Sequence, residues 1–231
     1  MKYILKSSKE IFTTYIINYL IIIILAIIYY LLGYTNIEIF LNNICSYILI
    51  SFYIITIIYL YNKNHIAEKT LPYKHYFPLI LLGISIATLL NMIIFLINPP
   101  IAITKPTIIT IISTGLIGPI YEEILFRYLL YNRLKKKYQV KKSILITTII
   151  FAITHISPLK IIYAFLLGII INIVYEKYSN IVAPILIHVA ANIIVIFLYE
   201  YNTYIFILSL ICLIISIILT TNIKIIKTLV K

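Results

Sequence analysis

Apolar residues are concentrated in eight long runs, which are separated by charged residues or proline. The runs cover approximately residues 11–33, 39–61, 77–97, 107–131, 143–157, 159–176, 180–199 and 203–220. A helix needs about 20 apolar residues to cross about 30 Å of hydrocarbon. The pattern therefore predicts an all-α fold, a polytopic transmembrane helix bundle with about eight spans, as one integral membrane domain over residues 1–231.

Two details of this pattern affect the span count. The fifth and sixth runs are short, and only the segment 157–160 separates them, so this hairpin either crosses the bilayer or turns inside the protein. Both alternatives return the chain to the side that it left. The first run is too long for a signal peptide, and no small-residue cleavage site follows it, so it is interpreted as a retained span.

The cations are distributed unequally between the two sides of the predicted bundle. Assigning alternate connections to alternate sides leaves Lys105 and Lys160 on one side and Arg127 within a span. All other cations fall on the opposite side, namely Lys2, Lys6, Lys9, Lys63, Lys69, Lys74, Arg133, Lys135, Lys136, Lys137, Lys141, Lys142, Lys177, Lys224, Lys227 and Lys231. By the positive-inside rule this cation-rich side is cytoplasmic, and both termini lie there.

Composition agrees with a bilayer location. The chain is 63% hydrophobic and 11% charged, with a mean hydropathy of +1.08, outside the range of soluble domains. The net charge of +12 resides in short gaps between apolar runs, so it indicates contact with anionic lipid and not with nucleic acid. Only Cys45 and Cys212 are present, which excludes a disulfide framework and a cysteine-based zinc pattern. His65 and His75, in the polar segment 62–76, are interpreted as solvated loop histidines.

A few ionisable or strongly polar residues remain inside the predicted spans. A charge at the centre of a membrane helix costs about 2.5–3.5 kcal/mol on insertion scales, so such residues face the bundle interior and find partners. They are Glu122, Glu123 and Arg127 in the fourth span, His155 in the fifth, and His188 and Asn192 in the seventh.

Their spacing predicts which side chains share a helix face. Glu123 and Arg127 are four residues apart, which permits a buried ion pair. Glu122 is rotated by about 100° from Glu123 and needs a different partner. His188 and Asn192 share one face of their helix, and Phe151 and His155 have the same spacing on theirs.

Three predicted spans bring polar groups to a similar depth. At about 1.5 Å per residue, Glu122 and His188 each lie about 16 Å from the nearest cation-rich connection, and His155 about 20 Å. A carboxylate that acts as a general base, with imidazole and amide donors for an oxyanion, is sufficient for adding water to an amide. The same set permits zinc binding by Glu122, His155 and His188, and a polar network that only fixes helix packing is a further alternative.

Three motifs resemble those of the CPBP family, which comprises type II CAAX prenyl proteases and bacteriocin-processing or immunity proteins. The segment from Gly118 to Arg127 resembles the EExxxR motif, Phe151 to His155 the FxxxH motif, and Ala183 to Asn192 the HxxxN motif. Their order and spacing fit, and the resemblance covers a catalytic core of approximately residues 79–199. The first two spans and the last lie outside it.

The resemblance implies an intramembrane endopeptidase with a site that opens towards the cytoplasm. By family analogy Glu122 activates the water, His155 assists, and His188 and Asn192 bind the oxyanion. Phe151 belongs to the FxxxH motif, and Glu123 and Arg127 are orienting or structural partners. The favoured mechanism needs no metal or other cofactor, and a zinc ion is the alternative. Tyr128 stands where family members commonly have glycine, so helix packing is expected to differ there.

We therefore expect hydrolysis of a peptide bond in a membrane-associated protein or peptide near the cytoplasmic face, with a prenylated CAAX-type substrate implied only by the family. The principal alternative is a non-enzymatic bacteriocin self-immunity or membrane-assembly protein on the same scaffold. A proton or ion carrier is a third hypothesis, because buried carboxylates and histidines also mark ion paths. The expected partners are the lipid bilayer and the substrate, and the sequence does not define an oligomeric state.

Overall fold

The computed structural model describes residues 2–34, 40, 45–97, 106–155, 157–198 and 202–221. All secondary-structure elements assigned within these residues are helical, which confirms the all-α prediction for them. The elements are α1 (Lys2–Leu31), α3 (Ser46–Asn64), η2 (Tyr73–His75), α4 (Tyr76–Ile97), α5 (Ile108–Thr110), η3 (Ile111–Ile117), α6 (Gly118–Glu123), η4 (Ile124–Tyr131), α7 (Asn132–Lys135), α8 (Val140–Ile153), α9 (Pro158–Tyr178), α10 (Val182–Phe197) and α11 (Thr203–Thr221).

Six of the described helical segments are long and apolar enough to cross a membrane. These are Tyr3–Leu31, Ser46–Asn64, Tyr73–Ile97, Ile108–Lys135, Pro158–Tyr178 and Thr203–Thr220. The other two predicted spans are also helical but shorter, with 14 residues in α8 and 16 in α10. At about 1.5 Å per residue, these two helices extend only about 21 and 24 Å. Both carry residues of the predicted site.

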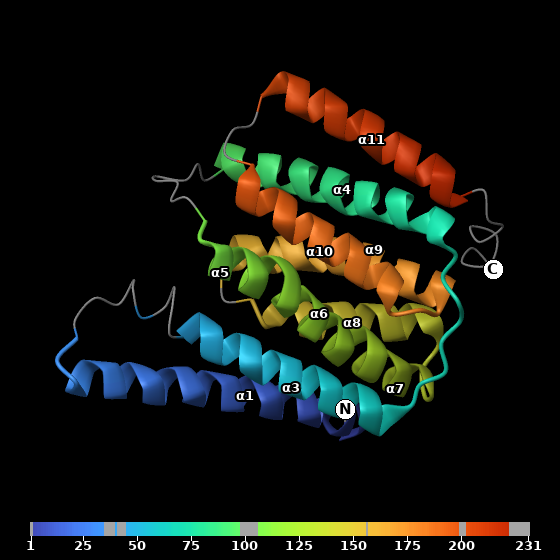
Figure 1. Cartoon of the computed structure of the whole chain (residues 1–231). Helices are drawn as coiled ribbons and strands as arrows, with labels where there is room; N and C mark the ends of the chain where they lie inside the picture. Colours follow the sequence, from blue (N-terminus) through green and yellow to red (C-terminus); the bar gives the residue numbers. More distant parts are fainter. Residues whose placement is uncertain are drawn as a thin grey trace.

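The helices lie side by side in a layered bundle (Figure 1). Helix α11 forms one edge and packs on α4, which in turn packs on α10. Helices α8 and α9 pair with each other, and α1 and α3 form the opposite edge. The segments α5 to α7 form one continuous rod, Ile108–Lys135, through the middle of this arrangement. The rod carries the predicted EExxxR motif.

The rod changes its helical repeat on both sides of this motif. Segments η3 and η4 are π-helical, whereas α6 between them is α-helical. The wider repeat begins before Pro119, which has no backbone N–H to donate, and the N–H of Gly118 bonds the carbonyl of Ser113. Since π-helical turns are rare and concentrate at functional sites, they mark α6 as a candidate position for chemistry.

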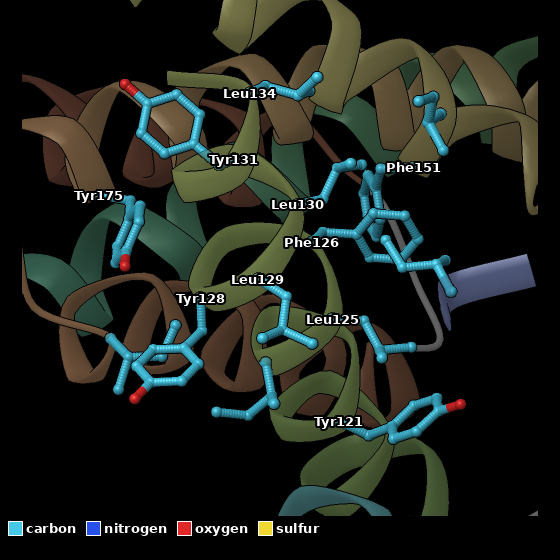
Figure 2. Close-up of a cluster of buried hydrophobic side chains, with 14 of the residues drawn as sticks. Tyr121, Leu125, Phe126, Tyr128, Leu129, Leu130, Tyr131, Leu134, Phe151 and Tyr175 are labelled. Atoms are coloured by element: carbon cyan, nitrogen blue, oxygen red, sulfur yellow. The ribbon is translucent and has the colours of Figure 1, made fainter. Parts of the chain in front are cut away.

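The largest buried cluster surrounds η4 (Figure 2). All eight residues from Ile124 to Tyr131 are buried. Tyr128 is one of them: its hydroxyl accepts the backbone N–H of Ile66 at 2.9 Å, and its ring stacks on Tyr61 with centroids 4.9 Å apart. The position where family members commonly have glycine is therefore filled by a tyrosine that joins the rod to α3 and its following loop.

Glycines allow close helix contacts next to the motifs. A Cβ atom on Gly83 would lie 2.3 Å from the carbonyl oxygen of Ile187, so α4 and α10 touch through their backbones. A Cβ on Gly115 would lie 3.1 Å from Ile196, and one on Gly168 would lie 3.1 Å from Phe151. The close approach that is typical of glycine in membrane helices brings α10 and α9 against the rod and α8.

The loop between α3 and η2 fixes the start of α10. The Glu68 carboxylate accepts the backbone N–H of Ile181 at 2.8 Å, and Asn180 donates to the carbonyl of Lys69 at 2.7 Å. Burial raises the pKa of Glu68, although the Ile181 N–H and the Tyr61 hydroxyl act in the opposite direction. His65 is exposed, as predicted for a loop histidine. The same prediction was wrong for His75, which is buried against Tyr178 because η2 folds back onto α9.

Candidate active site

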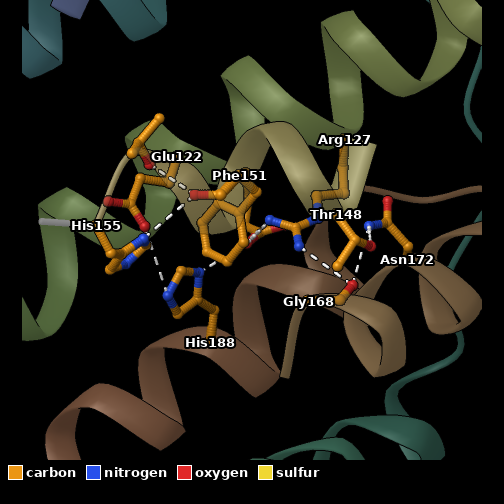
Figure 3. Close-up of polar contacts among 10 residues, drawn as sticks. Glu122, Arg127, Thr148, Phe151, His155, Gly168, Asn172 and His188 are labelled. Carbon is orange, nitrogen blue, oxygen red and sulfur yellow. Dashed lines mark hydrogen bonds and ion pairs between the residues drawn. The ribbon is translucent and has the colours of Figure 1, made fainter. Parts of the chain in front are cut away.

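Four predicted site residues line one pocket, which has a volume of about 530 Å³. Glu122 comes from α6, His188 and Asn192 from α10, and His155 from the turn that follows α8. Phe151, near the end of α8, also lines this pocket. Figure 3 shows Glu122, His155 and His188 directed towards one another. The structure thus brings together polar residues that the sequence placed at a similar depth on three different spans.

The two adjacent glutamates have different environments. The Glu122 side chain is 24% exposed and faces the pocket, with Oε2 3.6 Å from Nε2 of His188. The Glu123 side chain is fully buried, and its Oε1 lies 2.9 Å from Nη1 of Arg127. The predicted ion pair four residues apart is confirmed. Glu122 has the separate partner that its rotation on the helix requires.

Glu123 also contacts the next helix. Its Oε1 accepts Nδ1 of His188 at 2.7 Å, in addition to the bond from Arg127. A carboxylate that is paired with a guanidinium acts as an acceptor, so Nδ1 of His188 carries the hydrogen. This bond fixes the ring orientation and directs Nε2 towards Glu122. Glu123 is therefore placed to orient His188 as well as to balance the charge of Arg127.

Phe151 is at the centre of this arrangement. The Arg127 guanidinium lies over its ring at 4.4 Å from the centroid, within the range of a cation–π contact. The rings of His155 and His188 meet Phe151 edge to face, with centroid separations of 5.1 and 5.8 Å. One aromatic ring thus separates the buried guanidinium from the pocket and supports both histidines.

His155 lies beyond the helix that was predicted to carry it. Helix α8 ends at Ile153, and His155 follows in the turn, with its backbone N–H bonded to the carbonyl of Ala152 at 3.0 Å. Its Nδ1 lies 3.2 Å from the carbonyl oxygen of Phe151. A carbonyl can only accept, so Nδ1 carries the hydrogen and Nε2 of the neutral ring has a free lone pair. That atom is suited to accept a proton.

Asn192 is anchored to the π-helical part of the rod. Its amide nitrogen donates to the carbonyl oxygen of Thr114 in η3 at 2.9 Å. An amide group has two hydrogens, and this bond uses one of them. The side chain also lines the pocket. It therefore has donor capacity for a further acceptor while its position is fixed from η3.

A second polar layer behind the site was not predicted. Asn172 on α9 donates to Thr148 on α8 at 3.0 Å and to the carbonyl of Gly168 at 2.9 Å. The same carbonyl accepts Nη2 of Arg127 at 3.4 Å (Figure 3). Asn172 is fully buried. An amide four residues after a glycine within an apolar span was the available signal, and it indicates an interhelical contact.

The pocket opens at the end of the bundle opposite to the cation-rich connections. Its walls come from the second half of α4, the first half of α9 and the second half of α10. Thr114 and Lys160 at its rim are exposed. In Figure 1 these helix ends lie on the left, and the connections after α3 and α7 lie on the right. Towards the other end, all residues of η4 are buried.

This geometry corrects one expectation from the sequence. We predicted that the cation-rich end is cytoplasmic and that the site opens towards it. The opening towards that end is wrong for the described residues, because the pocket lining lies in the other half of the bundle and the residues of η4, on the cation-rich side of Glu122, are buried. Lys105, Lys224, Lys227, Lys231 and the first residue lie outside the described residues, so the structure does not place them.

The residues named for zinc binding line the same pocket. Glu122 and His188 approach to 3.6 Å through atoms that could ligate a metal, and Nε2 of His155 is not used by the bond to Phe151. In the described parts of the chain, however, no group of three or more His, Cys, Asp or Glu side chains has the arrangement of a metal site. The geometry therefore defines the pocket without defining a coordination sphere.

Comparison with known proteins identifies a related family. Residues 104–194 match the family model described as Type II CAAX prenyl endopeptidase Rce1-like. The matched segment contains all three motifs and every residue of the predicted site. Neither the curated proteins nor the solved structures gave a match.

Proposed function

We propose, on the CPBP family membership that the match over residues 104–194 supports, that this chain hydrolyses a peptide bond with a water molecule activated by Glu122. One observation carries the proposal. Glu122, His155, His188 and Asn192 come from three separate elements and line a single pocket.

In the proposed reaction the water is held between the Glu122 carboxylate and Nε2 of His155. Glu122 removes a proton from the water as it attacks the peptide carbonyl, and His155 is placed to assist this transfer. The proton held by Glu122 then passes to the leaving nitrogen, which restores the carboxylate. This cycle uses both groups at the pocket surface and needs no covalent intermediate on the protein.

The oxyanion of the tetrahedral intermediate needs hydrogen-bond donors. The remaining amide hydrogen of Asn192 is one. For His188 to be another, Nε2 must carry a hydrogen while Nδ1 donates to Glu123, so the ring must be doubly protonated. The Nε2 atom of this ring faces the Glu122 carboxylate and its Nδ1 atom faces the Glu123 carboxylate. Glu123 is thereby a positioning residue, which acts on the substrate through His188.

The proposed substrate is a membrane-associated protein or peptide. The family description points to CAAX-type prenylated proteins, and the apolar walls of the pocket, including Ile94, Leu159 and Val195, suit an apolar segment. Comparing protein termini in membranes from cells with and without an active copy tests this function. Substrates should lose the uncut terminus only when the active copy is present, and identical termini in both membranes would contradict an endopeptidase.

We propose that the cation-rich end is cytoplasmic, with both termini on that side. This assignment follows from the charge asymmetry of the connections. In this orientation the pocket opens on the side opposite to the cytoplasm. Single cysteines at Ser157 and Lys136, in a chain without Cys45 and Cys212, would test it. An impermeant maleimide should label Ser157→Cys in intact cells and Lys136→Cys only after permeabilisation. The reverse pattern would overturn the assignment.

We propose that the reaction proceeds without a bound metal, because Glu122 and His155 supply the proton transfers themselves. Dialysis against a strong chelator should leave the rate of peptide hydrolysis within about twofold of the untreated protein, and elemental analysis should find zinc well below one ion per chain. Activity that disappears on chelation and returns with added zinc would contradict this proposal and show that a metal ion activates the water.

A further inference from the structure

Lys160 is a cation at the rim of the active-site pocket. It belongs to the first turn of α9, two residues after Pro158, and it lines the same pocket as Glu122 and His188. Among the described residues of this lining, Lys160 is the only lysine or arginine. It lies at the open end of the pocket, whereas the buried floor is formed by Phe151, Leu167 and His188.

The position of this lysine is unusual for the chain. It lies at the cation-poor end of the bundle, where the alternation of connections places only one other cation, Lys105. In the described part of the chain, no carboxylate lies within 4 Å of its ammonium group. By contrast, Arg133 and Lys135 at the opposite end are both paired with glutamates. Lys160 thus lines the pocket without a carboxylate partner among the described residues.

The start of α9 adds to this positive potential. Helix α9 has 21 residues, and its N-cap residue Ser157 makes no side-chain capping hydrogen bond. The N-terminus of a helix carries a partial positive charge and backbone N–H groups without intrahelical partners. Ser157 and Leu159 line the pocket beside Lys160. A negatively charged group that enters the pocket therefore meets an ammonium and the positive end of a helix together.

We infer that Lys160 is a specificity-determining residue that binds a carboxylate of the substrate at the open end of the pocket. This inference rests on the proposed function, because it names the substrate group that the same site selects. The walls near Lys160 are apolar, including Leu159, Val195 and Ile196, so the bound segment is an apolar peptide with an anionic end or side chain. The carboxylate comes either from a free C-terminus or from an acidic residue near the scissile bond.

Three matched dansylated apolar peptides test this inference with the protein in nanodiscs. One has a free C-terminal acid, one a C-terminal amide, and one a C-terminal amide with a glutamate beside the terminus. Binding is measured to Glu122→Gln, and cleavage to the protein with Glu122 intact. The free acid should bind about three- to tenfold more tightly than the amide, and the preference should decrease at high salt. Binding of the third peptide, compared with that of the plain amide, shows whether the carboxylate of an acidic side chain is selected as well as that of a free C-terminus.

Variants of Lys160 separate recognition from folding. Lys160→Ala should remove the preference for the acid while binding of the amide peptide is unchanged, and Lys160→Arg should retain it. Lys141→Ala, at an exposed lysine on α8 outside the pocket lining, is the matched control and should behave like the parent. Equal binding of acid and amide, binding of neither, or a preference that survives Lys160→Ala would overturn the inference. Acid-selective binding without cleavage would refute the proposed function and leave this inference intact.

Discussion

Replacing Arg127 with methionine is expected to destabilise the folded protein by about 3–5 kcal/mol, because the change leaves the Glu123 carboxylate buried without its counter-ion. Both side chains are fully buried, and they are joined at 2.9 Å. Unfolding in lipid nanodiscs, measured for the parent and the variant, gives the difference directly. Lys135→Met is the control, since Lys135 pairs with Glu176 on the surface and such pairs contribute about 1 kcal/mol or less.

Combining Arg127→Met with Glu123→Leu extends this prediction to function. The double variant removes both charges, so it should regain part of the lost stability. It should not regain activity, because Nδ1 of His188 loses the acceptor that orients its ring. A double variant that is as active as the parent would show that Glu123 has no positioning role. One that is no more stable than Arg127→Met alone would contradict the ion-pair explanation.

Replacing Glu122 with glutamine is expected to lower kcat for peptide hydrolysis by roughly 10²–10⁴-fold, the usual contribution of general acid–base catalysis. Glutamine preserves the size of the side chain but cannot accept the proton of the attacking water. KM should change little, because the change leaves the apolar walls of the pocket intact. Initial rates over a range of substrate concentrations separate these two effects.

The chain offers a matched control for this substitution. Glu176 is also 24% exposed, but it lies at the far end of α9, where it pairs with Lys135. Glu176→Gln should retain kcat within about twofold, because surface ion pairs contribute little. If both glutamine variants lost activity to the same extent, the loss would reflect protein stability and not the chemistry of Glu122.

Local spacing allowed much of the site to be predicted. The ion pair between Glu123 and Arg127 depends only on the geometry of one helix, so four residues of separation were sufficient to predict it. Within the described residues, each of the eight apolar runs contains a helical segment, and six of these segments are long enough to cross a membrane, because a long apolar run is stable in lipid as a helix. The shared depth of Glu122, His155 and His188 followed from counting residues from the charged connections.

Features that depend on helix rotation and packing were not predictable. Nothing in the sequence indicates that His188 of α10 donates to Glu123 and not to Glu122, because this depends on how the two helices face each other. The end of α8 before His155 depends on the turn into α9, which apolarity alone does not reveal. The burial of η4 on the cation-rich side of the pocket depends on helix packing, and in the sequence its residues form an ordinary apolar run. The burial of His75 similarly depends on a tertiary contact with Tyr178.

The most direct test of the central claim is hydrolysis by the purified protein in nanodiscs in water enriched in ¹⁸O. A peptide that copies a cleaved membrane substrate is incubated with the parent and with Glu122→Gln, and the products are analysed by mass spectrometry. We expect the parent to produce a new carboxyl terminus with one ¹⁸O atom and the variant to produce almost none. Cleavage by Glu122→Gln at the rate of the parent would contradict water activation by Glu122.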